Sequence, residues 1–296
     1  MLAFHSRAKG TTMIDHTKVG SPAANWERTW TTRDTMLYAV SVGAGAHDPT
    51  DELRFTTDNT SGITQQVLPT FVTVMAAGEA ATQNPLTVLG DIAVTSIVHG
   101  GQRITLHNDI PPAGSVVSRG SIAAIYDKGR HAAIVLASTI TDADDGTPYA
   151  DIETTMILTG EGGFGGNPGP KASWSVPDRE PDEIVTDHTR PEQALLYRLN
   201  SDRNPLHSDP AFAAFMGRTR PTLHGLCTYG YAGRAVLATV AESDPGRFGS
   251  FFARFAAPVE PGDELHTLIW RTENGALFQT KVGDTVVLDH GEFRLR

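Results

Sequence analysis

The chain reads as two copies of one unit, and this internal repeat is the feature that most restricts how it can fold. Tyr38 in the first half matches Tyr197 in the second, and a leucine precedes each. A Pro-Thr pair recurs further on in both halves, at 69–70 and 221–222. A Pro/Gly turn, an alternating segment and a polar turn ending in glycine then follow in each copy. Their common order, at offsets of about 150 residues, predicts a duplicated domain.

Each copy predicts the same elements: a short helix, a loop, a longer apolar helix and then several strands. Residues 224–241 of the second copy are apolar nearly all round, which is typical of a buried helix. The later segments alternate or run apolar with β-branched and aromatic residues, as strands do. An antiparallel sheet wrapped around a helix, made twice, is an α+β fold. The expected division is a leader at 1–12, a first repeat at 13–161, a Gly/Pro-rich linker at 162–181 and a second repeat at 182–296.

Composition excludes several classes of protein. The net charge of −10 argues against a nucleic-acid partner. A lone cysteine, Cys227, rules out an intramolecular disulfide and gives no sign of secretion. We find no apolar run of the ~18–20 residues that a membrane span requires, so a cytoplasmic protein is expected. The leader is interpreted as an upstream start or an expression remnant, because its apolar part is too short for a signal peptide.

The stretch YRLNSDRNPLHSDPAFA, residues 197–213, concentrates groups that can hold charge or protons. The helix before it should lose its regularity near Asn204, because a residue that precedes proline is pushed out of the helical region. Asp209, followed by proline, should begin the next short helix. Asp202, Asn204 and His207 are therefore expected on a rigid turn between two helices.

The buried helix should begin close to Gly225, which places this glycine in its first turn. Backbone N–H groups there have no acceptor within the helix and suit a developing negative charge. Glycine also lets a ligand approach the backbone closely. A carboxylate, an imidazole, an amide and an oxyanion donor are thus all available. This set favours proton transfer beside a carbonyl that gains enolate character, such as adding water to an α,β-unsaturated thioester or removing it.

Other chemistries are not favoured. The sequence has no activated-serine elbow, and Cys227 falls inside the apolar helix, where core packing is expected. The eleven histidines show no zinc-ligand spacing, so no metal is expected. GEGGFG at 160–165 matches a nucleotide-binding pattern, but the prolines after it prevent the helix that such a site needs.

Two stretches carry a resemblance to a known family. YRLNSDRNPLHSDPAFA and RPTLHGLCTYGYAGRAV resemble the (R)-specific enoyl-CoA hydratase 2 family, the MaoC-like dehydratases, in their double hot-dog form. The D-x-N-P-x-H pattern with H-G-L downstream is highly specific, and segments such as VHGGQRITLHNDIPPAG extend the similarity over nearly the whole chain after the leader. The resemblance implies a double hot-dog fold and reversible hydration of trans-2-enoyl-CoA to (R)-3-hydroxyacyl-CoA. It implies no cofactor, since coenzyme A is part of the substrate.

The resemblance also implies residue roles. Asp202 and His207 would jointly hold the water and move the proton at Cα, giving syn addition. Asn204 would orient them, and the backbone N–H of Gly225 would receive the thioester oxygen. The sequence departs from the family pattern where Asn200-Ser201 replaces Ser-Gly and where Thr222 replaces isoleucine, but neither change affects a proton-handling position.

The first copy lacks this set. Aligned on the repeat, Asp202 falls on Gly43, Asn204 on Gly45 and His207 on Asp48. Only one active site is therefore expected. The first half is then free to widen the acyl pocket. Segments that resemble the family's CoA channel predict further substrate contacts at His99, Gly100, Gly163, Gly165 and His224.

Two alternatives remain beside the acyl-CoA substrate. The same chemistry on acyl carrier protein would make the chain a 3-hydroxyacyl-ACP dehydratase of fatty-acid synthesis. A non-catalytic acyl-binding hot-dog subunit is a second alternative, although the complete catalytic set speaks against it. A homodimer is the expected assembly.

Overall fold

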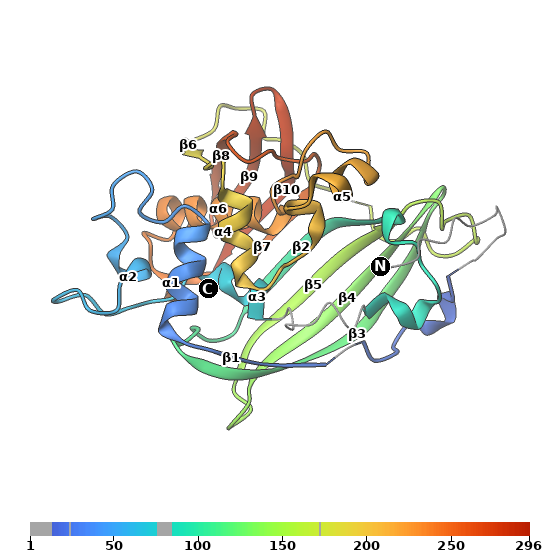
Figure 1. Ribbon diagram of the computed structural model, residues 1–296, viewed down its shortest axis with the longest axis horizontal. Helices are drawn as coiled ribbons and strands as arrows, with labels where there is room; N and C mark the ends of the chain where they lie inside the picture. The colour runs from blue at the N-terminus through green and yellow to red at the C-terminus, as the bar shows by residue number, and fades with distance from the viewer. Residues whose placement is uncertain (1–13, 24, 76–84, 172) are drawn as a thin grey trace.

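The computed structural model describes residues 14–23, 25–75, 85–171 and 173–296. Within these residues the chain forms one antiparallel 10-stranded sheet, in the order β1-β3-β4-β5-β2-β7-β10-β9-β8-β6 (Figure 1). From one edge inward the order is β1-β3-β4-β5-β2, and from the other edge inward it is β6-β8-β9-β10-β7. The two orders correspond strand by strand, β1 to β6, β3 to β8 and so on. The sheet therefore consists of two copies of one five-stranded unit, as the internal repeat predicts.

The strands of the first half are β1 (Trp26–Trp30), β2 (Ile97–Leu106), β3 (Gly114–Lys128), β4 (His131–Asp142) and β5 (Pro148–Leu158). Those of the second half are β6 (Glu183–His188), β7 (Phe248–Phe255), β8 (Glu264–Thr272), β9 (Gly275–Val282) and β10 (Thr285–Leu295). The two units join where β2 pairs with β7, from Gly101 opposite Arg254 to Thr105 opposite Ser250. Alternating burial along β3 reflects its alternating sequence, with one face toward the core.

The longest helix, α6 (Gly225–Val240), lies buried at the centre, as predicted from its apolar sequence. Two glycines allow the first repeat to pack directly on its backbone. A Cβ on Gly230 would lie 2.5 Å from Val42, and one on Gly233 would lie 2.5 Å from Thr70. The predicted buried helix is confirmed, and it belongs to a core shared by both repeats.

At the matching position of the first repeat, the described residues end at Met75. The structure has a short 3-10 turn there, η2 (Pro69–Phe71), and then α3 (Val72–Met75), all of it buried. The continuation of the longer helix expected in this copy falls on 76–84, outside the described residues. The predicted leader at 1–12 also lies outside them.

The remaining α-helices are α1 (Thr32–Ser41), α2 (Leu53–Thr56), α4 (Gln193–Tyr197) and α5 (Pro210–Phe215). The other 3-10 turns are η1 (His16–Lys18), η3 (Pro85–Leu89), η4 (Val94–Ser96), η5 (Arg198–Asn200), η6 (Pro205–His207) and η7 (Pro245–Arg247). α1 and α4 are the repeated helices that carry Tyr38 and Tyr197. Both tyrosines are fully buried, and their ring centroids lie 6.2 Å apart at the junction of the two copies.

The Gly/Pro-rich segment 162–181 has neither helix nor strand in its described part, but it is fastened at several points. The Asp127 carboxylate accepts hydrogen bonds from the backbone N–H groups of Gly163, at 2.9 Å, and Gly165, at 2.7 Å. The Trp174 indole donates to the carbonyl of Gly291 at 3.0 Å. The segment is thus held against both repeats, while the exact repeat boundaries stay a prediction. Among the helices described, none is long and apolar enough to cross a membrane.

Candidate active site

The turn that follows α4 begins at Ser201. The sequence predicts helical regularity until near Asn204, but the helical residues of η5 end earlier, at Asn200. Ser201 adopts a left-handed backbone with φ of 100°, which stops the helix at this point. Asn200 is buried, and its side-chain amide donates to the carbonyl of Tyr197 at 2.9 Å. The backbone reverses sharply here and brings Asp202 to the start of the next segment.

Local hydrogen bonds hold the turn. The backbone N–H of Asn204 donates to Oδ1 of Asp202 at 3.1 Å, and the Asn204 side chain accepts from the N–H of Leu206 at 3.0 Å. Asn204 therefore caps η6, the single helical turn that carries His207. Asp209 then caps α5, as predicted, by accepting from the N–H of Ala211 at 2.8 Å.

His207 is held in one tautomer. Its Nδ1 lies 2.8 Å from the carbonyl oxygen of Thr222, which can only accept, so Nδ1 carries the proton. Nε2 then keeps a lone pair that can receive a proton. Burial lowers the pKa of His207 below its usual value, partly countered by the hydrogen bond to Thr222 and by the charge of Asp202. The imidazole is therefore uncharged near neutral pH, and its free Nε2 can accept a proton.

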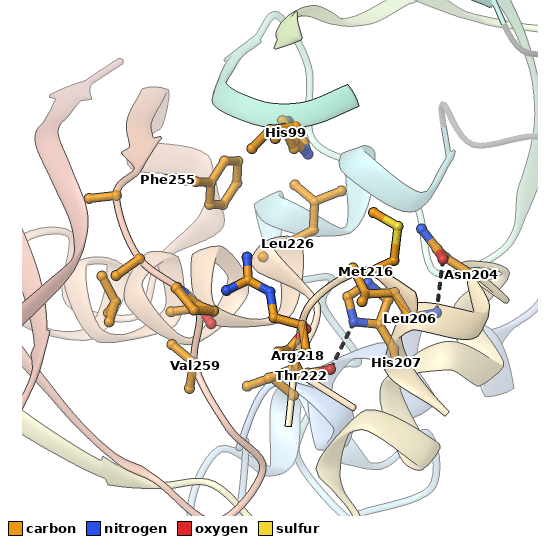
Figure 2. A pocket seen from close by; sticks show the side chains of 18 of the residues that line it. His99, Asn204, Leu206, His207, Met216, Arg218, Thr222, Leu226, Phe255 and Val259 are labelled. Carbon is orange, nitrogen blue, oxygen red and sulfur yellow. Dashed lines mark hydrogen bonds between the residues drawn. The ribbon is translucent and has the colours of Figure 1, made fainter. Parts of the chain in front are cut away.

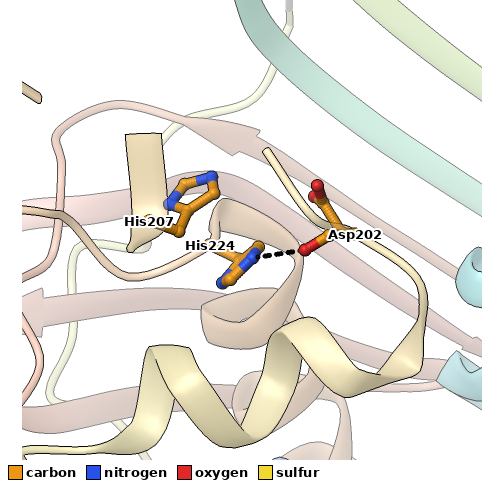
Figure 3. Close-up of side chains that lie close together, drawn as sticks. All are labelled: Asp202, His207 and His224. Carbon is orange, nitrogen blue, oxygen red and sulfur yellow. Dashed lines mark hydrogen bonds between the residues drawn. The ribbon is translucent and has the colours of Figure 1, made fainter. Parts of the chain in front are cut away.

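Asp202, His207 and His224 form a compact cluster (Figure 3). A carboxylate oxygen of Asp202 and one ring nitrogen from each histidine lie within 4.8 Å of one another. Such spacing would suit a metal ion, but Nε2 of His224 lies 3.1 Å from the backbone carbonyl of Asp202 and must carry a proton to bond there. That nitrogen cannot act as a metal ligand while this hydrogen bond persists.

A cavity of about 430 Å³ opens beside the cluster (Figure 2). All four predicted catalytic residues line it: Asp202, Asn204, His207 and Gly225. The rest of the wall is largely apolar, and both repeats contribute to it. Its other members include Ile97, Val98, His99, Met156, Leu206, Met216, Arg218, Leu226, Phe255 and Val259.

Gly225 is the first residue of α6, so its N–H belongs to the helix turn whose amides have no intrahelical acceptor. A Cβ at this position would lie 3.1 Å from the Phe255 ring, which leaves little room for a side chain. His99 contacts the same aromatic ring, with centroids 4.5 Å apart, and its Nε2 lies 3.1 Å from Oε1 of Gln102. Burial lowers the pKa of His99 to about 4, so this histidine is neutral as well.

The sequence predicts five further substrate contacts. His99 lines the cavity, whereas Gly100, Gly163, Gly165 and His224 do not. Gly163 and Gly165 wrap the Asp127 carboxylate, and Gly100 packs on Ile157. His224 is buried behind His207. That these four residues contact a bound substrate stays a prediction, because this cavity is not the whole path that a CoA thioester would take.

Sequence reasoning missed two cavity residues, Arg218 and Phe255. Arg218 follows α5 on an exposed loop, and Phe255 ends β7. Neither belongs to a chemical motif. Only the packing of α5 and β7 around the start of α6 places them in the wall.

The corresponding turn of the first repeat is filled. Gly43 has φ of 89°, and a Cβ there would lie 2.3 Å from the Tyr231 ring. Arg234, next along α6, bonds the Glu52 carboxylate at 2.9 Å and also forms an ion pair with Asp187. The Glu52 carboxylate in turn accepts from the N–H of Gly45 at 3.1 Å. Packing and a buried ion-pair network thus occupy the position that the acid and imidazole hold in the second repeat.

The fold and the site together define a class, the double hot-dog proteins with one active-site turn. A solved protein of Mycobacterium tuberculosis described as having this fold superposes with a TM-score of 0.52 at 16% identity, over 93% of this chain and 96% of the other. The "MaoC-like dehydratase from Phytophthora Capsici" superposes with a TM-score of 0.85 at 28% identity, over 96% and 98%.

Sequence comparison then gives the family. The MaoC-like domain model matches residues 173–291, and the MFE-2 hydratase 2 N-terminal domain model matches 29–160. The chain is 44% identical to "3-hydroxyacyl-thioester dehydratase Y" of Mycobacterium tuberculosis over 294 residues, covering 94% of this chain and 97% of the relative. It is 34% identical to "Enoyl-CoA hydratase 2, peroxisomal" of Arabidopsis thaliana over 266 residues, 86% of each. The chain belongs to the MaoC-like dehydratase and hydratase 2 family.

Proposed function

We propose that this protein is a hydro-lyase that adds water to trans-2-enoyl-CoA to give (R)-3-hydroxyacyl-CoA, and catalyses the reverse dehydration. One observation carries the proposal: Asp202 and His207 lie within 4.8 Å on a single rigid turn, in the wall of an apolar cavity that also contains Gly225. A thioester acyl chain fits the apolar wall, and its reacting carbons would meet the acid, the base and the amide together.

The chemistry follows from these groups. A water molecule held between Asp202 and His207 loses a proton to the pair as its oxygen bonds to Cβ of the enoyl chain. The electron pair of the double bond moves toward the thioester, and its oxygen becomes an enolate that accepts from the N–H of Gly225. The same proton then passes to Cα. Because the pair holds that proton on the side from which the oxygen is delivered, oxygen and hydrogen reach one face of the double bond, and one water is consumed.

The expected contributions are large enough for an enzyme. General acid–base catalysis by positioned groups is worth about 10²–10⁴-fold. An oxyanion donor adds about 10²–10³-fold. The reaction involves no net oxidation or reduction, and the acid, base and amide supply each of its steps. We therefore propose that it needs neither a redox cofactor nor a metal.

Relatives with names that include CoA or thioester substrates support a CoA thioester here. Arg218 adds a physical reason. Among the described residues that line the cavity it is the one arginine or lysine, and it is exposed, as expected at a mouth. We assign it to the anionic part of coenzyme A. An acyl carrier protein substrate remains the second candidate, and the cytoplasmic location and homodimer remain predictions.

The test is an assay of the purified protein on trans-2-enoyl-CoA thioesters of short, medium and long chains, following the loss of enoyl absorbance. Hydration of at least one thioester, with (R)-3-hydroxyacyl-CoA as product, is expected. Carrier-protein thioesters of the same acyl groups are assayed in parallel. Faster turnover of those would favour the dehydratase of fatty-acid synthesis. Absence of hydration and of dehydration on every thioester would overturn the proposal.

A further inference from the structure

His224 lies at a junction that the proposed mechanism does not use directly. It is the residue that precedes α6, it is only 1% exposed, and it lies between two aromatic neighbours. Its ring centroid is 3.8 Å from that of His207, at an interplanar angle of 27°, and 4.9 Å from that of Tyr197. The ring of His224 therefore stacks against the imidazole of His207 and supports it.

The same side chain also reaches Asp202. Its Nε2–H donates to the backbone carbonyl of Asp202 at 3.1 Å, as the dashed line in Figure 3 shows. Asp202 follows Ser201, whose left-handed backbone is unfavourable for a residue with a side chain. A hydrogen bond just after such a residue helps to hold the turn in place. One buried side chain thus contacts both members of the proton-handling pair, through a ring on one side and a donor on the other.

A histidine at position 224 has an energetic cost that packing alone does not explain. Nδ1 of His224 is buried and has no hydrogen-bond partner among the described residues. A buried nitrogen without a partner costs about 1–3 kcal/mol. A phenylalanine would fill the same space without that cost. What histidine supplies at this position and phenylalanine does not is the Nε2–H donor.

His224 must also stay neutral to serve in this way. Burial, together with the charge that His207 can carry, lowers its pKa to about 3. Asp202 and its carbonyl oppose that shift only in part. A neutral ring adds no positive charge beside His207, so it can support that imidazole without suppressing its protonation during turnover.

We infer that His224 is a positioning residue: its Nε2–H fixes the Asp202 turn and its ring supports His207, so that the two groups share one water. The inference rests on the proposed hydration, which it deepens. The sequence-based expectation that His224 contacts the substrate stays a separate prediction.

Three substitutions separate the donor from the ring. His224→Gln places an amide N–H the same number of bonds from the backbone as Nε2. His224→Asn is one bond shorter, and His224→Phe keeps the ring without the donor. We expect His224→Gln, which keeps the donor but loses the ring, to lower kcat by less than about tenfold. His224→Asn and His224→Phe should lower kcat by about tenfold or more, with KM within about twofold.

Thermal unfolding of each variant accompanies the kinetics, and ¹⁵N NMR reports the His207 tautomer and its titration. A merely structural role predicts lower stability with kcat unchanged in the folded fraction. The inference is overturned if His224→Gln loses as much kcat as His224→Asn, or if all three keep wild-type kcat. If the wild type hydrates no thioester, the proposed function fails, and the NMR spectra still test the positioning: the titration of His207 should change more in His224→Asn, which loses ring and donor reach, than in His224→Gln, which loses the ring alone. Unchanged spectra in both would contradict it.

Discussion

A carboxylate oxygen of Asp202 lies within 4.8 Å of a ring nitrogen of His207, with only four residues between them in the chain. Both residues belong to one turn and both line the cavity, and Figure 3 shows the two side chains near each other. The turn is held by the Asn204 amide, by the cap on η6 and by the bond from His207 to Thr222. This arrangement, more than any single residue, defines the chemistry that the site can perform.

Removing either member of the pair should abolish most activity without unfolding the protein. Asp202→Asn keeps the shape but cannot hold a proton-accepting charge, and His207→Ala removes the base. We expect each to lower kcat for hydration by about 10²–10⁴-fold. The double variant should lose little more than the worse single one, since the groups act on one water. Steady-state kinetics with circular dichroism checks this, and a rate near wild type for either single variant would contradict the role assignment.

The buried histidines predict a loss of stability in mild acid. Burial lowers the pKa values of His99, His207 and His224, to about 4 and about 3 for the first and last. In the unfolded chain each has an ordinary pKa of about 6.5, so the unfolded state binds more protons below that pH. The contribution of these histidines to the free energy of unfolding is therefore fully present above about pH 6.5 and is lost as the pH drops toward about 4. Urea unfolding at several pH values measures it.

His99→Gln serves as the matched variant for this pH series. It removes one buried imidazole, and its pH dependence should be shallower than that of the wild type. If the free energy of unfolding stays constant or rises as the pH is lowered from about 6.5 to about 4.5, the proposed burial of neutral histidines is contradicted.

Gly225→Ala should impair catalysis by crowding rather than by removing the amide. The new methyl would lie 3.1 Å from the Phe255 ring, close enough to displace the ring or the acyl chain beside it. We expect kcat/KM to fall by about tenfold or more. Adding Phe255→Leu should restore part of the loss, because it makes room. If the double variant is no better than Gly225→Ala, the contact with Phe255 is not the cause.

Ser201→Gly should stabilise the protein. Ser201 has φ of 100°, a region that glycine enters at little cost and other residues enter at about 1–3 kcal/mol. Part of that gain is lost to the greater freedom of glycine in the unfolded chain, leaving about 1 kcal/mol. Ser208→Gly is the matched control. Ser208 has φ of −147°, so glycine there should only destabilise. Chemical unfolding of both compares them, and equal effects would exclude a strained Ser201.

The catalytic turn could be predicted because its determinants are local. Proline, aspartate and asparagine set the turn and its caps within a few residues, so the pattern itself shows that Asp202, Asn204 and His207 lie together. The position of Gly225 follows from the apolar helix that begins there. The repeat also predicts that both halves form the same sheet-and-helix unit.

The rest depends on contacts between distant segments. Phe255 and Arg218 enter the cavity only through the packing of β7 and α5, which no local pattern encodes. His224 is adjacent to Gly225 in sequence, yet its ring stacks against that of His207 instead of lining the cavity. The positions of Gly163 and Gly165 depend on Asp127, which lies more than thirty residues away in the chain. The early end of the α4 segment depends on the backbone angle of Ser201, which its residue type does not favour.

The stereochemistry of hydration in D₂O tests the shared-water geometry most directly. With a trans-2-enoyl-CoA substrate, a single water held by Asp202 and His207 must deliver hydroxyl and deuterium to the same face. The predicted product is one diastereomer of 2-deutero-(R)-3-hydroxyacyl-CoA, with the two new bonds syn, as read from its proton coupling by NMR. An anti product or a mixture of diastereomers at C2 would show that the two groups do not act on one water, and an (S) alcohol would contradict the predicted face of addition.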